Sequence, residues 1–81
     1  MSYFYVLRST LDGKLYKGST SNLTSRIADH NAVRVQATKN RRPLSLIYQE
    51  EFPSYKEALA REKYSKTFKG GKELSKILES I

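Results

Sequence analysis

The feature that most constrains the fold of this sequence is Asp12-Gly13, a turn signal between two short apolar runs. This pattern is typical of a β-hairpin, because glycine adopts the positive φ that a two-residue turn requires. A loop of two residues pairs Ser9 with Tyr16. Side chains alternate along a strand, so Tyr5 and Tyr16 are predicted to point to the same face of the sheet. The two strands are expected over residues 3–8 and 14–18.

A first helix is expected after the hairpin and should end near Asn31. It is preceded by four candidate N-cap residues at positions 19–22. Arg26 and His30 are four residues apart, so we expect them to be neighbours at the edge of the core. The inward stripe of this helix is predicted to be Leu23 and Ile27.

The second half of the sequence indicates one further strand and two further helices. Residues 44–50 contain the β-branched and aromatic types that strands favour. Ser54 and Glu57 match a capping box, in which a serine and a glutamate three residues later start a helix. Gly70-Gly71 interrupts the pattern, so a last helix is expected over residues 72–81. Its inward residues are predicted to be Leu74, Ile77, Leu78 and Ile81.

Glu62 lies in line with the apolar stripe of the helix that begins at the capping box. The other members of this stripe are Tyr55, Ala58 and Leu59. A carboxylate there is costly unless a cation, a metal ion or water lies beside it. The residues alone leave two explanations open, a salt bridge to Arg26 or a lysine, and a metal-binding role.

These elements predict an α+β fold, a small three-stranded antiparallel sheet with helices packed on it in the order ββαβαα. With 81 residues, we expect a single domain over residues 1–81. The absence of cysteine excludes disulfides and thiolate metal sites, and a single histidine disfavours zinc. No apolar run approaches the roughly 20 residues that cross a bilayer. The first residues do not resemble a signal peptide, so a cytoplasmic location is expected.

The charge of the chain favours a nucleic acid as its partner. The net charge is +7 and the isoelectric point is about 9.8, and such an excess attracts polyanions. Residues 31–43 are basic and contain no acid. A solvated basic surface without a partner is the alternative. The candidate nucleic-acid contacts are Lys17, Arg34, Lys39, Arg41, Arg42, Lys63 and Lys66.

Several segments, in this order, resemble the GIY-YIG endonuclease domain, in particular its small stand-alone bacterial branch. The same domain is found in the incision subunit of bacterial nucleotide excision repair. This chain has Tyr3-Phe4 where the family has glycine and isoleucine, and Ser19 where the excision-repair relatives have lysine. The similar segments are Tyr3-Phe4-Tyr5-Val6-Leu7, Leu15-Tyr16-Lys17-Gly18, the stretch from Asn22 to Asn31, Glu57 to Lys63, and Lys66 to Leu74.

The resemblance implies a metal-dependent endonuclease that hydrolyses phosphodiester bonds in DNA, with selectivity for DNA structure and a role in repair or recombination. It implies that Glu62 binds one Mg²⁺ or Mn²⁺ ion and that Arg26 contacts the scissile phosphate. Tyr5 is favoured for activating the water, with Tyr16 orienting the water or the phosphate, and His30 can relay a proton or form a hydrogen bond to the phosphate. The predicted catalytic residues are therefore Tyr5, Tyr16, Arg26, His30 and Glu62.

Other interpretations of the same residues remain open. The two tyrosines can be half-buried sheet aromatics, Arg26 can form an ion pair, and His30 can be a packing residue. The chain can also be a non-catalytic nucleic-acid-binding module on the same fold, or a basic protein that docks on an assembly such as the ribosome. RNA is not excluded as the substrate, and a protein partner can supply target specificity.

The basic segment is testable through the salt dependence of DNA binding. Each phosphate contact adds about one unit to the slope of log affinity against log salt concentration. Arg41→Ala or Arg42→Ala should therefore flatten that slope by up to about one unit, measured by fluorescence anisotropy with a labelled DNA. Unchanged slopes in both variants would show that these arginines do not contact phosphate.

Overall fold

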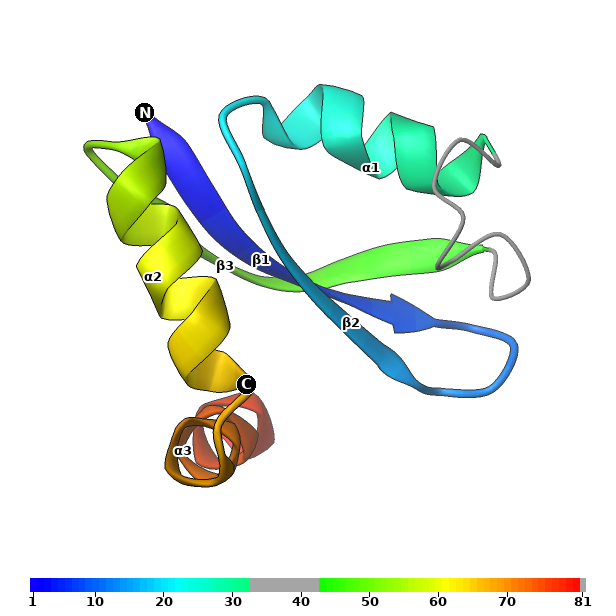
Figure 1. Cartoon of the computed structure of the whole chain (residues 1–81). Coiled ribbons are helices and arrows are strands. Elements are labelled where there is room, and N and C mark those ends of the chain that lie inside the picture. The colour runs from blue at the N-terminus through cyan, green and yellow to red at the C-terminus, as the bar shows by residue number, and fades with distance from the viewer. Residues whose placement is uncertain (33–42, 81) are drawn as a thin grey trace.

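The structure, a computed structural model, describes residues 1–32 and 43–80, which form an α+β fold in the predicted order ββαβαα (Figure 1). The described strands are β1 (Ser2–Ser9), β2 (Leu15–Thr20) and β3 (Leu44–Phe52). The described helices are α1 (Leu23–Asn31), α2 (Tyr55–Ser65) and α3 (Phe68–Glu79). Part of the basic segment falls outside the described residues, and with it the candidate contacts Arg34, Lys39, Arg41 and Arg42.

The sheet is antiparallel with the strand order β2-β1-β3, so β1 is central and β2 lies at an edge. Tyr16 pairs with Leu7 and not with Ser9, so the predicted register was wrong by two residues. The cause is a longer turn: the Ser9 hydroxyl accepts a hydrogen bond from the backbone N–H of Leu11, and Gly13 adopts a φ of 74°. A shift of two residues keeps the side-chain face, so Tyr5 and Tyr16 do share one face as predicted.

The central strand is buried on both faces, and the helices are divided between them (Figure 1). Tyr5 and Leu7 belong to a cluster that the apolar side of α1 covers. Phe4 and Val6 point the opposite way and pack against Leu74 of α3. Each of these four β1 side chains is at most 1% exposed. The strand therefore connects two small cores. The α1 residues that complete the first of them are Leu23 and Ile27, as predicted.

Helix α2 begins at the predicted capping box. The Ser54 hydroxyl oxygen accepts a hydrogen bond from the Glu57 backbone N–H at 3.3 Å and donates one to the Glu57 carboxylate at 3.1 Å. Ala58 is fully buried, but Tyr55 is 48% exposed, so Tyr55 does not belong to the inward stripe. Glu62 lies one turn beyond Ala58 and is held against the sheet.

The last helix starts four residues earlier than predicted, at Phe68, and Gly70-Gly71 lies inside it. The hydroxyl of Thr67 caps the helix by accepting from the Gly70 N–H at 3.0 Å. Gly70 lies inside the helix and does not break it. A Cβ atom at this position would lie 1.8 Å from the Tyr64 carbonyl oxygen, so only glycine allows the helix to lie this close to that carbonyl group. Leu74 is buried and Leu78 packs against the same core, as predicted, whereas Ile81 lies outside the described residues.

The two adjacent glycines should respond in opposite ways to alanine. Gly70→Ala should lower the free energy of unfolding by about 3 kcal/mol or more, because the added methyl group meets a backbone carbonyl and not a flexible side chain. A Cβ atom at Gly71 has its nearest neighbour at an ordinary 3.5 Å. Gly71→Ala should therefore raise the stability by about 0.5–1 kcal/mol. Urea denaturation measures both, and equal effects would contradict this packing.

Candidate active site

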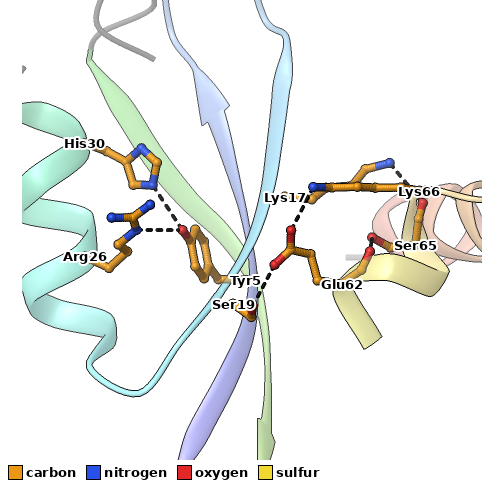
Figure 2. Close-up of polar contacts among 8 residues, drawn as sticks. All are labelled: Tyr5, Lys17, Ser19, Arg26, His30, Glu62, Ser65 and Lys66. Carbon is orange, nitrogen blue, oxygen red and sulfur yellow. Dashed lines mark hydrogen bonds and ion pairs between the residues drawn. The ribbon is translucent and has the colours of Figure 1, made fainter. Parts of the chain in front are cut away.

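The hydroxyl group of Tyr5 is the centre of a buried polar cluster between the sheet and α1 (Figure 2). Tyr5 Oη lies 3.0 Å from Nε2 of His30, and Arg26 Nε donates a hydrogen bond to it at 3.4 Å. Arg26 and His30 come from successive turns of α1, which places both above the same strand. We call Tyr5, Tyr16, Arg26 and His30 the phenol cluster. The sequence predicted all four residues, and the structure brings them together.

Gly18 creates the space that the Tyr5 ring occupies. The two residues are directly opposite each other on β1 and β2, and a Cβ atom at Gly18 would lie 2.3 Å from Tyr5 Oη. Any larger residue would displace the phenol from His30 and Arg26. Gly18, in the segment Leu15-Tyr16-Lys17-Gly18, is therefore needed to position Tyr5.

Tyr16 also packs against His30. The ring centroids of Tyr16 and His30 are 4.7 Å apart, and their planes meet at 63°, an edge-to-face arrangement that aromatic rings favour. His30 is fully buried, not at the core edge as predicted, whereas Tyr16 is half-buried. Of the two phenols, Tyr16 is therefore the one that solvent or a substrate can reach.

The environment of the phenol cluster fixes its protonation. Burial, and to a smaller extent the nearby Arg26 guanidinium, lowers the pKa of His30 from its usual 6.5. Burial raises the pKa of Tyr5, although the Arg26 hydrogen bond partly opposes this. At neutral pH, Tyr5 is consequently a neutral phenol and His30 a neutral imidazole. The Tyr5 oxygen accepts a hydrogen bond from Arg26 Nε, and the direction of the Tyr5–His30 hydrogen bond is set by which ring nitrogen of the neutral imidazole carries the proton.

Glu62 does not make direct contact with the phenol cluster. Figure 2 shows the Tyr5 hydroxyl directed toward α1 and the Glu62 carboxylate on the other side of the strands. Ser19 of β2 donates a hydrogen bond to Glu62 Oε1 at 2.6 Å, and Lys66 Nζ lies 2.7 Å from Oε2. Of the open alternatives, the structure therefore contains a salt bridge to a lysine. The role of Ser19 was not predicted, because the Glu62 carboxylate that it meets lies far away in the sequence.

The Glu62 carboxylate fits a divalent cation that keeps most of its water ligands. Within residues 1–32 and 43–80, no group of three or more histidine, cysteine, aspartate or glutamate side chains could enclose a metal ion. One carboxylate, with waters and substrate oxygens as the other ligands, is sufficient for Mg²⁺. The Glu62 side chain is 16% exposed, so it remains accessible. The Lys66 side chain is 55% exposed, and such an exposed ion pair is weak enough to open.

The described lysines that were predicted to contact nucleic acid have different surroundings. Lys17 Nζ donates a hydrogen bond to the Ser65 carbonyl oxygen at 3.2 Å and so joins β2 to the end of α2. Lys66 pairs with Glu62, and Lys63 is exposed. Lys63 and Lys66 thus lie near the carboxylate on α2, while Arg26 lies on the side of the sheet that carries α1.

The chain is similar to known proteins over most of its length. The family model of the GIY-YIG catalytic domain matches residues 1–73. A UPF0213 protein of Staphylococcus haemolyticus is 45% identical over 95% of this chain and 94% of its own. A UPF0213 protein of Staphylococcus saprophyticus is 42% identical, again over 95% of this chain and 94% of its own. The NMR structure of a UPF0213 protein from Bacillus halodurans is 30% identical, with a TM-score of 0.56, over 95% of this chain and 85% of that one.

The buried imidazole makes stability depend on pH. Because the folded state lowers the pKa of His30 below 6.5, the unfolded chain binds more protons as the pH falls past that value. The free energy of unfolding should therefore decrease below about pH 6.5, by at most about 1.4 kcal/mol per pH unit from this group. His30→Gln cannot titrate and should show a smaller decrease between pH 7.5 and 5.5 in urea denaturation. Parallel pH profiles would rule out this role for His30.

Proposed function

The chain belongs to the GIY-YIG family, and on this premise we propose that it is a metal-dependent endonuclease that hydrolyses phosphodiester bonds in DNA. The observation that carries the proposal is the phenol cluster on one side of the edge strand β2, with the Glu62 carboxylate on the other side. A binding module does not need a buried tyrosine that contacts both a buried histidine and a half-buried arginine. A hydrolase needs such groups to hold a phosphate and to move a proton.

Arg26 is suited to hold the scissile phosphate. Its Nε atom contacts Tyr5, so the phosphate would meet the terminal nitrogens of the guanidinium. The planar guanidinium matches two phosphate oxygens at once. The hydrogen bond to Tyr5, with Tyr16 as a weaker contributor, raises the pKa of Arg26, and a guanidinium is in any case charged at physiological pH. Positive charge is therefore available where negative charge develops on the phosphate during hydrolysis.

Tyr16 is better placed than Tyr5 to contact the attacking water. The sequence favoured Tyr5 for water activation, but Tyr5 is only 1% exposed, whereas Tyr16 is half-buried. In this proposal, Tyr16 acts as the phenolate: it takes one proton of the water and becomes a neutral phenol, while the hydroxide that forms attacks the phosphorus. The adjacent Arg26 stabilises the phenolate before the step and the negative charge on the phosphate oxygens during it. Tyr5 fixes the positions of Arg26 and His30 through its two hydrogen bonds.

Glu62 would hold the divalent ion, with the Ser19 hydroxyl orienting one carboxylate oxygen. A bound Mg²⁺ or Mn²⁺ would supply positive charge to the phosphate oxygens and to the leaving oxygen. DNA is the proposed substrate because of the family and the net charge of +7. A role in repair or recombination and a protein partner that selects the target are part of the same proposal.

A non-catalytic nucleic-acid-binding module is the second candidate, and one observation favours it. The ammonium group of Lys66 lies 2.7 Å from the Glu62 carboxylate, where a metal ion would bind. If this pair does not open, the carboxylate is a structural group, and the basic surface binds DNA without cutting it.

The substitution Glu62→Gln separates the two candidates. It removes the anionic ligand but keeps the size of the side chain and an oxygen for Ser19. Nicking of supercoiled plasmid in Mg²⁺ or Mn²⁺ should fall by at least about 100-fold, whereas DNA affinity in EDTA should not weaken. Glu79→Gln, at an exposed carboxylate at the end of α3, is the matched control and should cut like the wild type. Equal plasmid nicking by wild type and Glu62→Gln would remove Glu62 from the catalytic site.

A further inference from the structure

Phe68 is the most exposed large apolar side chain among the described residues, at 85%. It is the first residue of α3, whose inward side is formed by Leu74 and Leu78. Phe68 therefore contributes little to the core. A phenyl ring in water at the start of a well-capped helix has no evident structural role.

One lysine contacts this ring, and two more are its neighbours in the sequence. Lys72 Nζ lies 5.2 Å from the centroid of the Phe68 ring, within the range of a cation–π interaction. Lys69 and Lys66 are exposed on either side in the sequence. We call Phe68, Lys66, Lys69 and Lys72 the Phe68 patch.

The Phe68 patch is continuous with the candidate active site. Lys66 follows the last residue of α2 and reaches back to Glu62 at 2.7 Å, and Phe68 comes two residues later. Figure 1 shows α3 starting directly beside the end of α2. A strand of DNA with its phosphate on a cation held by Glu62 would thus pass Lys66 on the way toward the ring.

We propose that the Phe68 patch binds DNA through one unpaired base, which stacks on the Phe68 ring while the lysines contact the flanking phosphates. Single-stranded nucleic acid is bound in this way, by aromatic rings that stack on bases within a positively charged surface. The bases of an intact duplex are stacked on one another and present no free face to the ring. The inference rests on the proposed function and specifies its substrate class, DNA with unpaired nucleotides beside the cleaved bond.

A tryptophan at this position tests the contact directly, because the chain contains no tryptophan. Phe68→Trp places a single fluorophore in the Phe68 patch, and Tyr55→Trp places one at the exposed far end of α2 as the matched control. In EDTA, DNA with a single-stranded flap should quench the emission of Phe68→Trp at least about twofold, as expected when a base stacks on the indole. The emission of Tyr55→Trp should stay nearly constant. Unchanged emission of Phe68→Trp with bound DNA, or equal quenching by blunt duplex, would overturn the inference.

The affinity of Phe68→Leu provides the second measurement. Leucine keeps an apolar side chain at this exposed position but cannot stack. The affinity for flap DNA in EDTA should fall about tenfold, while the affinity for blunt duplex of the same length should change less than twofold. Equal losses on both substrates, or no loss on either, would contradict base stacking.

The proposed function and this inference fail in different ways. If the wild type cuts DNA but Phe68→Leu binds flap and duplex DNA as the wild type does, only the inference is wrong. If the wild type binds flap DNA with the stacking signature but does not cut it in Mg²⁺ or Mn²⁺, the patch is confirmed and the nuclease proposal is wrong. If the wild type binds no DNA, both are wrong.

Discussion

The hydroxyl group of Tyr5 is the constraint on which the rest of the structure depends. It lies on the central strand, where burial is nearly complete on both faces, and a buried hydroxyl without partners costs about 1–3 kcal/mol. His30 and Arg26 satisfy it, which fixes how α1 lies over the sheet. Gly18 leaves room for the Tyr5 hydroxyl, so the residue of β2 that pairs with Tyr5 must be a glycine. The β1 segment around Tyr5, the β2 segment around Gly18 and helix α1 are thus parts of one packing arrangement.

The edge strand β2 separates two chemical environments. On the side of α1, uncharged phenol and imidazole groups lie beside one guanidinium. On the side of α2, Ser19 holds a carboxylate next to an exposed lysine. A phosphate at this edge could meet Arg26 from one side and a cation bound to Glu62 from the other. The arrangement supports the proposed hydrolysis because it provides cationic groups for the phosphate together with a half-buried phenol, Tyr16, for the water.

Local patterns in the sequence predicted most of the fold, and the exceptions have physical causes. The capping box predicted the start of α2 because both of its partners lie within one turn. The register of the hairpin was wrong because the Ser9 hydroxyl stabilises a longer turn. Gly70-Gly71 indicated a break, whereas Gly70 serves a close approach to the Tyr64 carbonyl that only the folded chain reveals. The sequence placed the two phenols on one face and Arg26 beside His30, and these groups do come together. Glu62 was expected to converge with the phenols and Arg26, but it contacts Ser19 and Lys66 instead, and these partners depend on contacts between distant segments.

The most direct test of the account is single-turnover cleavage of a labelled flap DNA in Mn²⁺ by wild type and Tyr16→Phe. DNA affinity in EDTA and the urea midpoint are measured on the same samples. If Tyr16 takes the proton of the attacking water, its loss should slow cleavage by about 100-fold to 10,000-fold with little change in affinity or stability. Cleavage by Tyr16→Phe at the wild-type rate would contradict the central claim that the phenol cluster is the active site.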